Sequence, residues 1–204
     1  MTFDFFNAFS GESDEKEMKN DMSSRSKKIK TKIRFENKLK KEKVSGVITE
    51  LPTSEESIHI VSNGNFDYFT IITRIIELSG AEVSDFYFST WTMSHQNVID
   101  ILDMYDKGIF QNVNALTGEY FRTRESAVFH ILDMGLKSRK QRLFANKNHA
   151  KVTLLQIGEN YYVVEGSANF TANPRIEQFI LSNHKDLFNF HKNWMNQLLK
   201  VIEK

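Results

Sequence analysis

The stretch that decides the fold runs from Asn148 to Leu181 and reads NHAKVTLLQIGENYYVVEGSANFTANPRIEQFIL. Apolar, β-branched and aromatic residues fill three short segments of it, and polar residues with Gly or Pro stand between them. This pattern predicts strands in quick succession, over residues 149–156, 161–167 and 176–181.

Upstream of this stretch, strand-like and helix-like segments alternate. Strands are predicted over residues 58–61, 85–91, 109–116 and 142–145, and helices over residues 67–79, 94–107 and 123–136. Ser94 is suited to cap the second of these helices, and a closing helix is expected over residues 185–202. The alternation predicts an α/β protein, an α/β/α sandwich with a mixed central sheet.

Five polar side chains accompany the last three strands. His149 and Lys151 are two residues apart on a predicted strand, so both are expected on one face of it. Ser167 and Asn169 repeat this spacing at the end of the next strand, and Glu177 opens the one after. An imidazole, an ammonium, a hydroxyl, an amide and a carboxylate are therefore expected to meet at one end of the sheet.

The H-x-K of residues 149–151, followed by the G-S-x-N of residues 166–169, resembles the motif of the phospholipase D superfamily. The resemblance covers residues 57–200 and implies a phospholipase D-like half-unit. It implies that His149 attacks a phosphodiester to form a phosphohistidine, and that Lys151 and Asn169 hold the phosphoryl oxygens. Ser167 would add a hydrogen bond, and Glu177 would accept the other ring N–H of the histidine.

Two departures from the family pattern refine this expectation. Gln156 stands where the family usually has an acid. Residues 149 and 156 are an odd number of positions apart, so on a regular strand their side chains point to opposite faces. An acid at this position would therefore have a structural role rather than a catalytic one. An H-x-K without this acid is similar to the metal-independent restriction endonucleases of the superfamily. The chain also has only one motif, so the histidine that protonates the leaving group must come from a second copy, and a homodimer is expected.

Charge is distributed unevenly along a chain of 204 residues with a formal net charge of +1. Residues 23–43 hold ten bases and two acids, a net charge of +8, whereas residues 44–204 carry −3. Residues 1–50 are therefore predicted to be a charged N-terminal arm and residues 51–204 the domain. Lysine and arginine clusters bind phosphate backbones, and the arm's candidate contacts are Lys28, Lys30, Lys32 and Arg34.

Further contacts are expected outside the motif. Thr90 and Trp91 end a strand near the predicted site, where a sheet of this kind lines its ligand crevice. A partner protein, or the domain itself, could bind the aromatic cluster of Phe3, Phe5, Phe6 and Phe9.

Composition excludes several classes of protein. The chain has no cysteine, which excludes disulfide scaffolds, cysteine zinc sites and cysteine nucleophiles. The remaining histidines lack ligand-like spacing, so neither a metal nor another cofactor is expected; they are His59, His95, His130, His184 and His191. No apolar run is long enough to span a membrane and no secretory signal is apparent, so a cytoplasmic location is expected.

The sequence favours a metal-independent phosphodiesterase, a nuclease acting on DNA or RNA. The alternative is a non-catalytic binding or assembly module with the same fold, because similar single-motif chains occur in phages and mobile elements. A lipid-cleaving enzyme is the weakest of the three hypotheses, because the basic arm has no amphipathic apolar face.

Overall fold

The computed structural model describes residues 25–30, 44–64, 66–171 and 175–200, with the backbone alone for residues 25–30. Its centre is an eight-stranded mixed sheet in the order β1-β2-β8-β7-β6-β3-β4-β5. Strands β3, β4 and β5 are parallel to one another, and every other neighbouring pair is antiparallel. The strands are β1 (Arg25–Lys30), β2 (Glu56–Ser62), β3 (Asp85–Thr90), β4 (Val113–Gly118), β5 (Arg142–Asn146), β6 (Val152–Ile157), β7 (Asn160–Gly166) and β8 (Glu177–Asn183).

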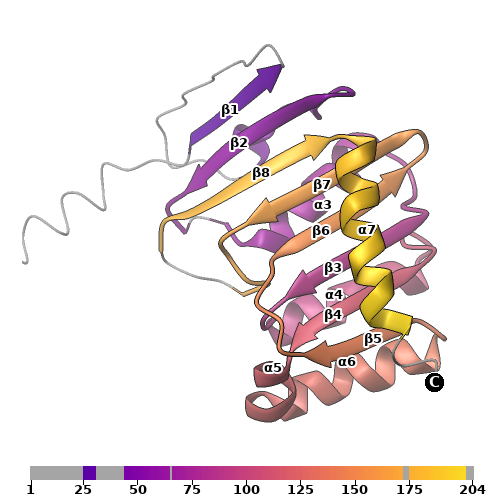
Figure 1. The fold of residues 1–204 in the computed structure, drawn as a ribbon. Coiled ribbons are helices and arrows are strands. Elements are labelled where there is room, and N and C mark those ends of the chain that lie inside the picture. Colours follow the sequence, from indigo (N-terminus) through magenta and orange to yellow (C-terminus); the bar gives the residue numbers. More distant parts are fainter. Residues whose placement is uncertain (1–24, 31–43, 65, 172–174, 201–204) are drawn as a thin grey trace, which may run out of the picture.

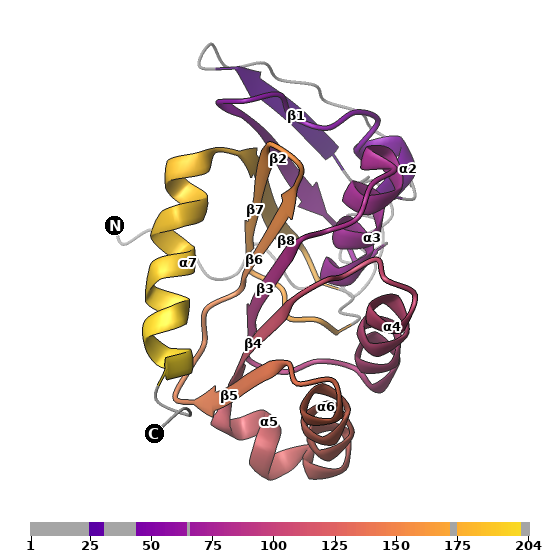
Figure 2. The same ribbon diagram turned by 90° about the vertical axis from the view of Figure 1, so that its right-hand side faces the viewer.

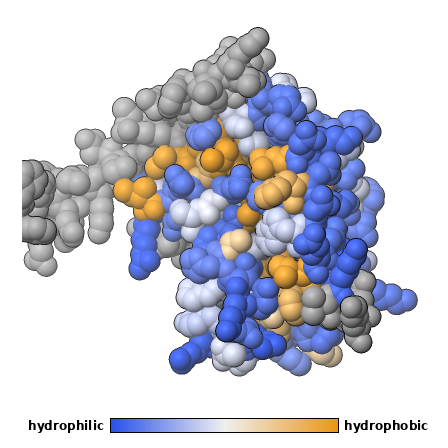
Figure 3. All heavy atoms as spheres, in the orientation of Figure 1, coloured by the Kyte–Doolittle hydropathy of each residue, from blue (hydrophilic) through white to orange (hydrophobic). Residues whose placement is uncertain are grey.

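Helices cover both faces of the sheet (Figures 1 and 2). One face carries α2 (Val44–Val47), α3 (Tyr68–Ser79), α4 (His95–Asp106) and α6 (Ser126–Ser138). The other face carries α7 (Lys185–Leu199), and the short α5 (Glu119–Arg124) lies beside the β5 edge. Seen from the side of α7, much of the surface is hydrophilic, and apolar side chains gather over the strands beside the helix (Figure 3). The predicted α/β/α sandwich with a mixed central sheet is confirmed.

Local sequence fixes the ends of the helices. Asp67 caps α3 by accepting a hydrogen bond from the backbone N–H of Thr70 at 2.9 Å, and Ser94 caps α4 in the same way. Gly80 ends α3 with a φ of 61°, a left-handed conformation that glycine adopts without steric cost. The contiguous H-K-D of residues 184–186 starts α7, where His184 Nδ1 accepts from the N–H of Leu187. Ser94 therefore caps a helix as predicted.

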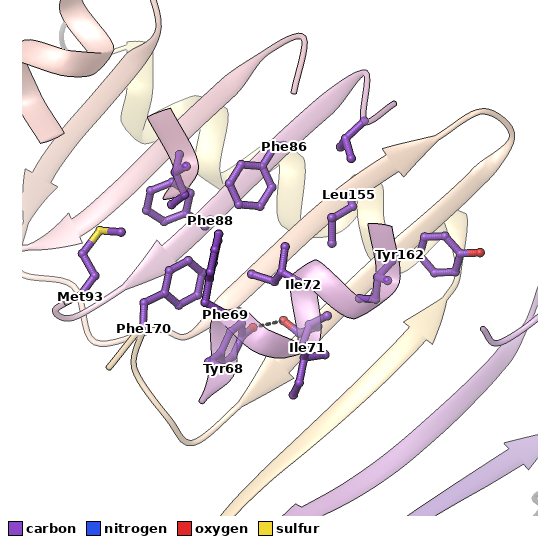
Figure 4. Packing of buried hydrophobic residues seen from close by; sticks show 14 of the residues in the cluster. Tyr68, Phe69, Ile71, Ile72, Phe86, Phe88, Met93, Leu155, Tyr162 and Phe170 are labelled. Atoms are coloured by element: carbon purple, nitrogen blue, oxygen red, sulfur yellow. Dashed lines mark hydrogen bonds between the residues drawn. The ribbon is translucent and has the colours of Figure 1, made fainter. Parts of the chain in front are cut away.

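The main core lies between the sheet and the α3, α4 and α6 layer, and it is rich in aromatic rings. Phe86 and Phe110 stack with ring centroids 4.2 Å apart. Tyr68 is fully buried and its hydroxyl donates to the carbonyl of Val164 at 2.6 Å (Figure 4), so its polar group is satisfied. A second, smaller core lies under α7 and includes Val152, Leu154 and Val163 from the sheet together with Phe188, Met195 and Leu199 from the helix.

Three predicted elements differ from the structure at their ends. The helix expected over residues 123–136 is two helices, because Glu125 breaks the helical backbone with φ −116° and ψ 42°. The strand expected over residues 109–116 begins only at Val113, after a single bridge between Phe110 and Val83. The strand expected from His149 begins at Val152, since the side chain of Asn148 accepts from the N–H of Ala150 at 3.0 Å and turns the chain there.

The structure also places part of the expected N-terminal arm in the domain. Strand β1 pairs antiparallel with β2 and extends the sheet. Val44, Val47 and Ile48 are buried in the main core, and the Ile48 carbonyl accepts from Arg74 Nε at 2.9 Å. Packed structure therefore begins before residue 51. Lys28 and Lys30 lie on β1, whereas Lys32, Arg34 and the phenylalanines at positions 3, 5, 6 and 9 lie outside the described residues.

Among the described residues, no helix is both long enough and apolar enough to cross a membrane.

Burial of Ile48 yields a test of this boundary. Ile48 is 0% exposed, so Ile48→Ala should lower the free energy of unfolding by about 2–5 kcal/mol, through lost apolar burial and a residual cavity. Ile99, which is 39% exposed on α4, is the matched control. Ile99→Ala should lower the free energy of unfolding far less. Urea unfolding measures both; equal, small effects would mean that residues 44–50 contribute nothing to the domain.

Candidate active site

The ends of five strands meet at one edge of the sheet. β3, β4 and β7 all run toward this edge (Figure 1), and β6 and β8 start there, because each is antiparallel to β7. His149 and Lys151 lie just before β6, Ser167 and Asn169 just after β7, and Glu177 is the first residue of β8. The topology thus brings the five predicted site residues to one edge.

His149 and Lys151 are in direct contact. The Lys151 Nζ lies 3.2 Å from Nδ1 and 3.4 Å from Nε2 of the His149 ring, and it donates to the His149 carbonyl at 2.7 Å. Burial lowers the pKa of Lys151, and the negative charge of Glu177 opposes that shift. Because an ammonium has only donors, this contact places a hydrogen-bond donor directly beside the imidazole.

The turn that carries His149 is tied to β3 by two side chains. Asn148 Nδ2 donates to Ser89 Oγ at 2.8 Å, and Ser89 Oγ donates to the carbonyl of Ala150 at 3.1 Å. Together with the bond from Ala150 N–H to Asn148, these contacts fix the backbone on both sides of the histidine. His149 itself is exposed, so its ring can meet a ligand from solvent. Sequence reasoning missed both residues, because it placed Asn148 next to a regular strand.

Ser167 and Glu177 form a hydrogen-bonded pair across β7 and β8. The Ser167 hydroxyl donates to Glu177 Oε2 and accepts from the backbone N–H of Gln178. The backbone N–H of Ser167 donates in turn to the Gln178 carbonyl at 3.1 Å. The carboxylate therefore orients the serine; a hydrogen bond from the imidazole to Glu177 stays a prediction.

Asn169 is positioned by the residue that follows it. Phe170 is 1% exposed and packs against Tyr68, Phe69 and Phe88 (Figure 4). Its carbonyl accepts from the N–H of Ser94 and from Asn97 Nδ2. With this anchor in place, Asn169 Oδ1 accepts from the backbone N–H of Trp91 at 3.3 Å, which leaves its NH₂ group as the donor toward a ligand.

Trp91 links the motif to a second aromatic residue. Its ring lies 5.5 Å from the His149 ring, tilted by 55°, and stacks on Tyr120 at 4.3 Å with an interplanar angle of 23°. Gly118 makes room for it, since a Cβ there would lie 2.5 Å from Trp91 Cδ1. Tyr120 was not predicted as a site residue, because the helix on which it lies was expected to begin only at residue 123.

Thr90, expected to bind substrate, is instead a supporting residue. It is 0% exposed, and its hydroxyl donates to the Thr92 carbonyl at 2.8 Å and accepts from the Phe170 N–H at 3.3 Å. Both hydrogen-bonding roles are used inside the protein, so the threonine holds the G-S-A-N-F segment against β3.

Gln156 lies near the opposite end of β6 from His149, where its register partners are Asp85 and Tyr161. It shares a sheet face with Val152 and Leu154, the face that α7 covers. Among the described residues, no group of three or more His, Asp or Glu side chains is placed to hold a metal ion.

Comparison with known proteins finds similarity among solved structures. No family model matches the chain, and no curated protein matches it. Among solved structures, it is similar to the crystal structure of a phospholipase D family member, Nuc from Salmonella typhimurium, with a TM-score of 0.48 and 14% identity. The match covers 62% of this chain and 85% of that one.

The role of Thr90 can be tested by removing its hydroxyl. Thr90→Val leaves the Phe170 N–H buried without an acceptor, which should cost about 1–3 kcal/mol of unfolding free energy. Thr90→Ser keeps the hydroxyl and should recover most of that loss. Thermal and urea unfolding measure the difference. A Thr90→Val protein of unchanged stability would contradict the supporting role.

Proposed function

We propose that this protein is a phosphodiesterase that cleaves nucleic acid through a phosphohistidine, in an active site shared by two copies of the chain, without a metal ion. The observation that carries the proposal is the contact between Lys151 Nζ and both ring nitrogens of an exposed histidine, at 3.2 and 3.4 Å. It supports the imidazole as nucleophile, because an ammonium lies beside the ring that would attack the phosphate.

The first step is attack by the imidazole on phosphorus. A ring nitrogen of His149 forms a bond to phosphorus, and the bond from phosphorus to the leaving oxygen breaks. The leaving oxygen takes a proton from an imidazolium, since an alkoxide is a poor leaving group. In the second step, water attacks the phosphorus, the bond from phosphorus to the His149 nitrogen breaks, and the water gives its proton to the imidazole that donated one before. The products are an alcohol and a phosphate monoester, and both histidines return to their starting forms.

Neighbouring groups stabilise the negative charge during both steps. Lys151 supplies a positive charge, and Asn169 offers its NH₂ group, because its oxygen is occupied by the Trp91 N–H. The Ser167 hydroxyl is oriented by Glu177 and Gln178 at the same edge. Glu177 also lies close enough to Lys151 to oppose the lowering of its pKa, which favours the charged ammonium at neutral pH.

The second imidazole is proposed to be His149 of another copy. Two of the other histidines have partners within the fold: His191 is buried against Glu165 and Trp194, and His184 pairs with Glu55 at the start of α7. Because a two-fold axis beside the exposed His149 would bring two copies of it together, one motif per chain suffices.

Nucleic acid is the proposed substrate on grounds of charge. The net charge of +8 on residues 23–43 contrasts with −3 on residues 44–204. Part of this basic segment, including Lys28 and Lys30, forms β1, the outermost strand of the sheet on the side of β2. A basic segment of this kind attracts a polyanion by counterion release. Lys28, Lys30, Lys32 and Arg34 are proposed as its contacts.

The proposal predicts nuclease activity that persists in excess chelator. The nucleophile belongs to the chain, so His149→Ala should lower cleavage of DNA or RNA to background, a loss of at least about a thousandfold. His130→Ala, at an exposed position of α6, is the matched control and should cleave like the wild type. Activity that chelator abolishes and magnesium restores would contradict the mechanism. Binding of nucleic acid without any cleavage would favour a non-catalytic binding module.

Mixed dimers test whether the site is shared. Equal amounts of wild-type and His149→Ala chains, unfolded together and refolded, should retain roughly a quarter of the activity of an equal number of wild-type dimers, since only wild-type pairs keep both imidazoles. Cleavage rates and light scattering of the mixture measure this. Activity at half would show that each chain works alone.

A further inference from the structure

We infer that Trp91 and Tyr120 form a base-stacking platform beside His149, and that the site therefore acts on single-stranded nucleic acid. The inference rests on the proposed function for the identity of the substrate, but its geometry is independent of the chemical step. Three rings lie in series: His149, Trp91 at 5.5 Å from it, and Tyr120 at 4.3 Å from Trp91.

The position of Trp91 is fixed before any ligand binds. Its backbone N–H donates to Asn169, and its indole lies over Gly118, where a Cβ would come within 2.5 Å of the ring and 2.7 Å of the Trp91 carbonyl. A rigid aromatic side chain loses little conformational entropy on binding. The platform is thus joined to the motif that carries Asn169, and a strand attacked at His149 passes beside it.

Tyr120 is the solvent-accessible end of this series. It is 42% exposed, although its ring stacks on Trp91. A core residue would have both ring faces covered, and an isolated surface tyrosine would have no aromatic neighbour. A nucleobase can extend the stack on the outer side of Tyr120, because every base has a π-face and stacking is tolerant of sequence.

The charges beside the platform fit the backbone of such a strand. Arg122 and Arg124 are exposed on α5, and Lys147 is exposed in the turn that leads to His149. Glu119, the acid next to Tyr120, is paired with Arg122 at 3.3 Å. The surroundings of the rings therefore carry a positive excess that attracts phosphates.

The preference for single-stranded substrates follows from stacking of a base on Tyr120. The bases of a duplex are paired and stacked on one another, so a base can reach Tyr120 only after it leaves the helix, whereas a single strand offers its bases at once. The platform should therefore favour single-stranded over double-stranded substrates and show little preference among bases.

Fluorescence tests the platform without depending on cleavage. The chain has two tryptophans, so Trp194→Phe leaves Trp91 as the reporter. Oligothymidylate of about twelve nucleotides with phosphorothioate linkages, a length within the range of single-strand sites, should quench its emission at saturation. Tyr120→Ala should weaken binding of this oligonucleotide about tenfold and leave duplex binding unchanged. Met134→Ala, 53% exposed on α6, is the control and should bind like the parent.

A second measurement covers the case in which Trp194→Phe does not fold. In the otherwise unaltered chain, a labelled oligothymidylate should be displaced more readily by an unlabelled one than by an abasic strand of equal length. Tyr120→Ala should remove that preference and Tyr120→Phe should keep it.

The outcomes separate this inference from the proposed function. Quenching without cleavage supports the platform and overturns the nuclease. Cleavage with unchanged Trp91 emission at saturation overturns the platform and leaves the nuclease standing. Failure to bind the oligonucleotide overturns the platform, whereas the nuclease is overturned only if neither single strands nor duplexes are cleaved.

Discussion

Strand β6 lies between β3 and β7 and is antiparallel to both, and the site depends on this position. The turn that precedes β6 is brought against the end of β3, and the segment that follows β7 is brought beside the same turn. Because β8 returns antiparallel to β7, its first residue lies at that edge as well. Residues from 91 to 177 in the sequence are thereby gathered without a long loop.

Contacts in the core then fix the segment that carries Ser167 and Asn169. Phe170 is held by three aromatic rings and two hydrogen bonds to its carbonyl, so the segment before it has little freedom. Thr90 ties the same segment to β3 from inside. His149 and Ser167 are exposed, whereas Thr90 and Phe170, which fix the backbone beside them, are buried. This division keeps the candidate site rigid and still open to solvent.

The strand-helix alternation and the grouping of the five motif residues could be predicted from sequence, because both depend on local periodicity and on strand ends. The role of Thr90 could not be predicted, because the sequence does not show whether the hydroxyl of a threonine at a strand end faces a ligand or a buried amide. The participation of Tyr120 was not predicted, because a helix was expected to begin only at residue 123, whereas α5 begins at Glu119. Residues 44–48 were assigned to the arm because their few apolar side chains follow a long charged run, and only tertiary packing shows that they are buried.

The central claim is that the His149 imidazole forms a covalent bond to phosphorus. Its most direct test is to quench the reaction with a substrate labelled at the scissile phosphate and to examine the protein by mass spectrometry. The account predicts a phosphoryl-linked adduct on the peptide that contains His149, stable in base and lost in acid, as expected for a phosphoramidate. Cleavage in which the label passes to water with no adduct on that peptide at any time of quenching would contradict it.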